Sequence, residues 1–143
     1  MRALLIFLLF SLSTSNAYAG TLTINITNIQ KTDGTIKLGL YDTGDVWLEH
    51  GKALKSFRKT TDASTDKITI VVEDLDESAF YGLALHHDTN GNDKMDLKMF
   101  PPGPAEGYAF SNIGKLGFTR PAWEDCKYSL KGDKVINLSI IYP

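Results

Sequence analysis

Apolar residues occupy alternate positions in most of the longer runs of this 143-residue chain. In "TLTINITNI", Leu22, Ile24 and Ile26 fall on one side of an extended backbone, and "TIKLGLYD" repeats the pattern. Because side chains alternate between the two faces of a β-strand, this spacing predicts strands with one buried face. Four further runs predict strands: "KITIVVE", "FYGLALHH", "AWEDCKYSL" and "KVINLSIIY". These six runs, with a possible seventh strand, predict an all-β fold.

Turn residues separate the predicted strands. Asp33-Gly34 ends "QKTDG", a pair suited to the positive φ of a tight hairpin, and "KGD" precedes the last strand. Short strands with turns at this spacing predict an antiparallel β-sandwich of about seven strands, immunoglobulin- or transthyretin-like, formed by one domain over residues 20–143. The less regular "TGDVWLEHGKALKSFRK" predicts at most a short helical turn. Residues 88–121 predict one long loop, ordered because its aromatic side chains (Tyr108, Phe110, Phe118) pack down.

Residues 1–19 have the pattern of a signal peptide. The basic start "MR" is followed by the apolar run "ALLIFLLFSL" and by "AYA", a small-x-small cleavage site. We expect a cut between Ala19 and Gly20, so that the mature chain is periplasmic or secreted. The apolar run is shorter than the roughly 20 residues that span a bilayer, and we expect no membrane span in the mature chain.

The charge of the mature chain bears on its partners. Residues 1–19 contain Arg2 and no acidic residue, so 14 basic and 17 acidic residues remain, a net charge of −3. Binding to nucleic acid or to an anionic membrane needs clustered Lys and Arg, so this mild acidity argues against both. Cys126, the only cysteine, stands in a strand-like pattern without a nearby His, which favours a buried, inert thiol.

The run "HHDTNGNDKMD", residues 86–96, concentrates oxygen ligands. With Asp88 as the first position, oxygen-bearing side chains stand at positions 1, 3, 5 and 9, and the residue at position 7 could add its carbonyl. This order begins the EF-hand ligand sequence for calcium. Asp93 stands at position 6, where an EF-hand has glycine, and Met99 replaces the glutamate of position 12. Glu106 is the nearest carboxylate that could complete the shell. The predicted ligands are Asp88, Asn90, Asn92, Lys94, Asp96 and Glu106. The calcium affinity predicted for this set is weak, roughly 10⁻⁴ to 10⁻³ M.

Other readings of the same run remain open. Asn90-Gly91 is a strong hairpin signal, and Asp and Asn are ordinary turn residues, so a metal-free hairpin is one alternative. A zinc or copper site is disfavoured because His86 and His87, adjacent on a strand, must point to opposite faces. One ring is expected to pack inward with its nitrogens bonded, and the other to lie beside the loop. The common catalytic motifs are missing, which argues against an enzyme.

The order of motifs resembles DUF2141, an uncharacterised bacterial family of exported β-sandwich proteins. The likeness extends from about Leu22 to Tyr142. In the family, the turn before the histidine strand is commonly Pro-Gly-x-Tyr; the "ESAFY" found here gives little support for a tyrosine corner at Tyr81. The family usually has glycine at the position of Asp93. The matching motif positions are His87, Asp88, Asn90, Asn92, Asp96, Glu106, Gly107, Tyr108, Phe110, Ser111 and Asn112. The resemblance implies the fold and an exported location. The first motif is also similar to calcium loops of cell-surface β-sandwich modules.

These observations predict an exported, non-enzymatic binding or structural module of the cell envelope. A weakly held Ca²⁺ would order the loop, and "GYAF", residues 107–110, would then face an unknown protein, peptide or glycan partner. One alternative is an enzyme or metal carrier that uses His87, Asp88 and Glu106. The other is a metal-free structural envelope protein.

Overall fold

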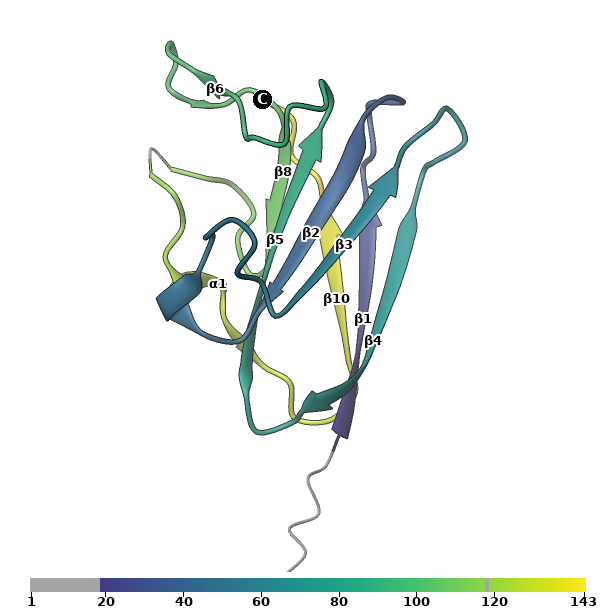
Figure 1. Cartoon of the computed structure of the whole chain (residues 1–143), viewed down its shortest axis with the longest axis vertical. Helices are drawn as coiled ribbons and strands as arrows, with labels where there is room; N and C mark the ends of the chain where they lie inside the picture. Colours follow the sequence, from purple (N-terminus) through teal and green to yellow (C-terminus); the bar gives the residue numbers. More distant parts are fainter. Residues whose placement is uncertain (1–18, 118) are drawn as a thin grey trace, which may run out of the picture.

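A computed structural model describes residues 19–117 and 119–143 (Figure 1). The expected signal peptide, apart from Ala19, and Phe118 therefore lie outside the described residues. One sheet has the strand order β10-β1-β4 and the other β3-β2-β5-β8. Their bounds are β1 (Ala19–Thr27), β2 (Thr35–Tyr41), β3 (Lys55–Thr60), β4 (Ile68–Asp76), β5 (Phe80–Asp88), β8 (Gly107–Phe110) and β10 (Lys134–Ser139).

Several short elements complete the two sheets. Strand β9 (Tyr128–Ser129) pairs with the beginning of β5, while β6 (Leu97–Lys98) and β7 (Gly103–Pro104) form a separate two-stranded hairpin. The helical elements are a 3₁₀ turn, η1 (Gly44–Val46), and one turn of α-helix, α1 (Trp123–Cys126). Within residues 19–117 and 119–143, no helix is long and apolar enough to cross a membrane.

The core lies between the two sheets, where the alternating apolar residues meet. In β1, Leu22, Ile24 and Ile26 are fully buried. Leu38 of β2 and Leu85 of β5 are buried on the facing sheet. The expected all-β sandwich is confirmed. One pairing departs from an antiparallel arrangement: β1 runs parallel to β10, with Ile24 opposite Ile136 in register.

The predicted hairpin between the first two strands is wrong. Gly34 has the positive φ expected of the turn, +93°, but β1 and β2 belong to different sheets. Each strand carries one apolar face, and both faces are buried when the chain crosses from one sheet to the other. The "KGD" turn likewise leads from β9, which pairs with β5, to β10, which pairs with β1.

The "AWEDCKYSL" segment is only partly a strand. Its first half forms α1, because the Trp123 ring packs outside the β2–β5 sheet, where a β-carbon on Gly82 would come within 2.7 Å of it. Cys126 and Tyr128 are then buried alternately, as predicted. Burial raises the pKa of the Cys126 thiol to about 11, so it is protonated at neutral pH and inert, as expected.

Strand β3 was not predicted as a strand. It lies at an edge of its sheet, and Phe57 is its only residue that is not exposed, so its sequence shows no alternation of apolar and polar residues.

The predicted helical turn exists as η1. The predicted long loop contains β6, β7 and β8 rather than irregular chain alone. Tyr81 does form the corner bond that "ESAFY" did not suggest: its hydroxyl donates to the carbonyl of Asp76 at 3.2 Å.

Candidate functional site

The candidate site lies where β5 leaves its sheet. Asp88 is the last residue of β5, and its side chain is only 1% exposed. On the outer face of the same sheet, cross-strand pairing sets Arg58 beside Lys37 and Lys37 beside His86. Two cationic side chains and a histidine, on three neighbouring strands, therefore adjoin the beginning of the acidic loop.

The Asp88 carboxylate organises the first half of the loop. It accepts the backbone N–H of Gly91 at 2.8 Å and that of Asp93 at 3.0 Å, and it pairs with the ammonium of Lys37. Burial acts to raise the pKa of this carboxyl, but the bonds from Lys37, Asp93 and Gly91 outweigh it and hold the pKa at about 2. Asp88 is therefore a buried carboxylate that stays charged at neutral pH.

The loop bends sharply at Asp93, which has a φ of +63°. This left-handed conformation is the one for which an EF-hand uses glycine at the equivalent position. Asp93 adopts it while its carboxylate lies 2.5 Å from Lys37 Nζ and 2.7 Å from an Arg58 guanidinium nitrogen. Asp93, which stands in place of the glycine, thus ties the loop to strands β2 and β3 through its carboxylate.

The second half of the loop is held by asparagines. The side-chain oxygen of Asn90 accepts the N–H of Asn92 at 3.1 Å, and that of Asn92 accepts the N–H of Lys94 at 2.9 Å. Both side-chain amides then donate to the carboxylate of Asp96 over 2.6 to 3.2 Å. Four predicted ligand residues, Asn90, Asn92, Lys94 and Asp96, are thus brought together on one loop.

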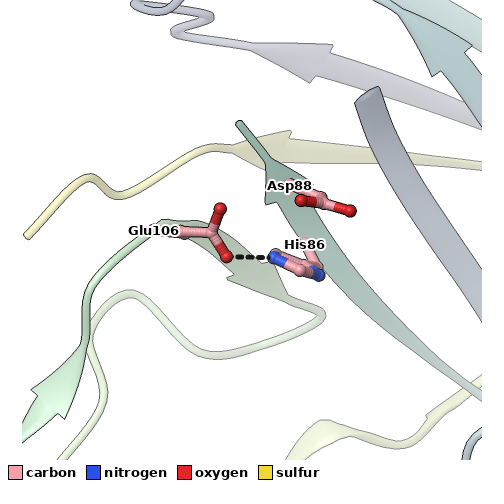
Figure 2. A group of neighbouring side chains, drawn as sticks. All are labelled: His86, Asp88 and Glu106. Carbon is pink, nitrogen blue, oxygen red and sulfur yellow. Dashed lines mark hydrogen bonds and ion pairs between the residues drawn. The ribbon is translucent and has the colours of Figure 1, made fainter. Parts of the chain in front are cut away.

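Glu106 closes the base of the loop from β8's side. One of its oxygens accepts the N–H of Thr89 at 2.9 Å, and the other accepts the N–H of Asp96 at 3.3 Å and lies 2.7 Å from His86 Nε2 (Figure 2). Burial acts to raise the pKa of this carboxyl, but the contacts from His86, Thr89 and Asp96 lower it. Glu106 therefore joins both ends of the loop.

The two histidines point to opposite faces, as predicted. The His87 ring is fully buried and lies 2.7 Å from the Tyr142 hydroxyl, 3.2 Å from Thr61 Oγ1 and 3.0 Å from the carbonyl of Asp33. Burial lowers the pKa of His87, which favours a neutral ring. These contacts tie His87 to the core, and it is His86 that lies beside the loop.

The histidine that lies close to both Asp88 and Glu106 is therefore His86, not His87. One nitrogen of its ring and one oxygen from each carboxylate lie within 4.8 Å of one another (Figure 2). Such a set could hold a divalent ion or exchange a proton between the ring and a carboxylate. Any cation bound there would replace the contacts that His86 and Lys37 now make.

Two parts of the site were not foreseen. Lys37 and Arg58 were missed because both lie on the polar faces of strands, where their sequence shows no sign of a partner 35 residues or more away. The "GYAF" segment was predicted to face a partner, but Gly107, Tyr108 and Ala109 are buried in β8, and Phe110 is half-buried.

The fold and this loop define an all-β sandwich protein with an acidic loop and a buried carboxylate pair at one end of a sheet. The chain belongs to the family DUF2141, described as an uncharacterized protein conserved in bacteria, whose model matches residues 24–137. We found no significant match among curated proteins or among solved structures.

Proposed function

We propose that this protein is an exported, non-enzymatic binding or structural module of the cell envelope whose loop takes a weakly bound Ca²⁺. The ligands would be side-chain oxygens of Asp88, Asn90, Asn92 and Asp96, the carbonyl of Lys94, and Glu106 at the base. The ion would be structural, fixing the loop and the β6–β7 hairpin that continues from it.

The bond from the Asp93 N–H to Asp88 carries this proposal. It coils the loop so that position 6 folds back on position 1, the bend that brings alternate side chains of a calcium loop toward one centre. The side-chain amide nitrogens of Asn90 and Asn92 also lie 2.6 to 3.2 Å from the carboxylate oxygens of Asp96, so the three side chains meet. A bound calcium ion would replace these bonds and would need the two amides to turn their oxygens toward it, because calcium takes only oxygen ligands here.

A second candidate is a transition-metal carrier. The close approach of His86, Asp88 and Glu106 supports it, because imidazole with carboxylates suits zinc or copper better than calcium. In this candidate His86 takes the part that the sequence had suggested for His87.

Thermal unfolding of the exported product of the full chain tests both candidates. At a free calcium concentration ten times its dissociation constant, an ion that binds only the folded state adds about 1.4 kcal/mol, which raises the melting temperature by several degrees. We expect this rise with calcium, a smaller one with magnesium, and its loss in Asp96→Asn.

The matched control is Asp62→Asn. Asp62 also caps a turn, through bonds from Ser64 and Thr65, but lies outside the site. It should keep the full calcium response. A rise with zinc alone that disappears in His86→Ala would favour the second candidate, and insensitivity to every ion would exclude both.

A further inference from the structure

The most exposed apolar side chains of the described structure gather at one hairpin. Met99 is 95% exposed, Phe100 93% and Leu97 70%. They stand within four consecutive residues, whereas the other exposed large apolar side chains are scattered over other elements, with exposures of 46% to 59%. Figure 1 shows the β6 hairpin projecting from the end of the sandwich, away from the sheets. Isolated exposed apolar residues are ordinary, but such a concentration at a protruding tip calls for a partner.

The hairpin stands on a defined base. Leu97 pairs with Pro104 and Lys98 with Gly103. Below them the N–H of Ala105 donates to the carbonyl of Asp96 at 2.6 Å, and the N–H of Asp96 donates to Glu106. Glu106, which closes the base of the acidic loop, therefore also fixes the base of the hairpin that carries the apolar tip.

We propose that this tip inserts into the interface of a phospholipid bilayer and holds the protein at a membrane surface. Residues 97–105 contain no acidic side chain, so none of them opposes entry among lipid phosphates. Lys98 is the only charge among them, and its long side chain can keep its ammonium at the headgroups while the tip is deeper.

The prolines of the tip favour lipid in particular. Three of the four residues from 101 to 104 are proline and have no backbone N–H. A backbone N–H that enters hydrocarbon without a partner costs several kcal/mol, because lipid offers it no acceptor. A tip with few such donors loses less on leaving water. A protein pocket would supply acceptors and would not require this composition.

The mode of binding follows from the charge of the chain. Its net charge is negative and Lys98 is the only charged residue of the hairpin, so insertion of Met99 and Phe100 must supply the affinity there. One apolar tip gives weak and reversible binding. The association should therefore survive high salt and depend little on the content of anionic lipid.

Co-sedimentation with phosphatidylcholine vesicles tests the inference. The full chain is expressed, its exported product is purified, and its N-terminus is determined by mass spectrometry, so that all variants compared share the same start. We expect partition at millimolar lipid, unchanged between 0.1 and 1 M salt, and a loss of about tenfold or more in Met99→Ser/Phe100→Ser. Phe100→Trp should retain binding and show a blue-shifted emission with vesicles, quenched by brominated lipid.

The matched control is Val71→Ser/Val135→Ser. It removes two other exposed apolar side chains, both on the β10-β1-β4 sheet and away from the hairpin, and should bind vesicles like the wild type. The inference is overturned if the wild type does not partition, which would leave a protein pocket as the occupant, or if the hairpin variant binds equally well. Each arm is run in chelator and in calcium: vesicle binding in chelator supports the inference whatever the calcium titration shows, so the two proposals can fail separately.

Discussion

The ammonium of Lys37 on β2 pairs with the carboxylate of Asp88 at the end of β5, 51 residues away. The Lys37 side chain is 17% exposed and that of Asp88 only 1%, so the pair lies at the rim of the buried region. Lys37 thus supplies the positive charge that balances the Asp88 carboxylate, to which the N–H groups of the loop are bonded. Its contacts with Asp88 and Asp93 raise the pKa of Lys37, against the opposing effect of burial, so the ammonium is retained at neutral pH.

Replacing Lys37 with methionine should destabilise the protein by about 3 kcal/mol. Methionine keeps most of the apolar stem but leaves a buried carboxylate without its charge partner, a loss that typically costs about 3 to 5 kcal/mol. Two backbone N–H groups still bond Asp88, so we expect the lower end of this range. Urea unfolding measures the change. Lys59→Met, on the exposed edge strand β3, should stay within about 0.5 kcal/mol of the wild type, and an equal loss in both variants would contradict the role of the pair.

Acid should remove the contribution of Asp88 over a defined range. Its folded pKa of about 2 lies below the ordinary value of 3.8, so folding favours the charged form. The resulting stability is fully present above pH 4 and is lost as the pH falls from about 4 to about 2. A shift of this size corresponds to roughly 2 kcal/mol. Carbon NMR of the Asp88 carboxyl should give a midpoint near 2, and a midpoint near 4 would show that Lys37 and the loop N–H groups do not hold the charge.

The left-handed bend at Asp93 can be separated from its ion pairs. Asp93→Gly and Asp93→Ala both remove the contacts with Lys37 and Arg58, but only alanine keeps a β-carbon at a φ of +63°. The side chains of Asp93 and Arg58 are more than half exposed, so their pairing should contribute little. We expect Asp93→Gly to unfold within about 0.5 kcal/mol of the wild type and Asp93→Ala about 1 kcal/mol below Asp93→Gly. Equal stabilities in chemical denaturation would mean that the loop relaxes around the new side chain.

The sequence predicted those features that depend on neighbours along the chain. Alternation in β1, β2, β4 and β5 revealed their buried faces, and the spacing from Asp88 to Asp96 identified a loop whose side chains do meet. The sequence also set Asp93 at the position where an EF-hand has glycine, and the chain does have a left-handed bend there. These features are local, because each depends on the backbone conformation of a few consecutive residues.

Features that depend on sheet register could not be predicted in the same way. The positive φ of Gly34 was evident, but a local turn signal does not say whether the next strand pairs with the last or crosses to the other sheet. Lys37 meets Asp88 because β2 pairs with β5 in a particular register. Strand β3 was missed because it has no alternating buried face, and α1 because the packing of Trp123 outside the sheet overrides the period of its sequence.

Gly34 should be the least replaceable glycine around the site, because the crossover chain presses against β5 there. A β-carbon on Gly34 would lie 2.3 Å from the carbonyl oxygen of Asp88 and 2.6 Å from the Cα of Thr89, at a φ of +93°. Gly91, on the loop itself, also has a positive φ, +74°, but no atom lies within 4 Å of its β-carbon position. Gly91→Ala should therefore cost only about 1 kcal/mol, from the backbone conformation.

Gly34→Ala adds a collision with backbone to the same conformational cost, so we expect a loss of roughly 3 kcal/mol or more in urea unfolding. Comparison of the two variants isolates the close approach, since both place alanine in the left-handed region. Similar losses would mean that the end of β5 can move away from the crossover. In that case Asp88 would not be held rigidly by the fold, and the geometry of the loop would depend on its own hydrogen bonds and on any bound ion.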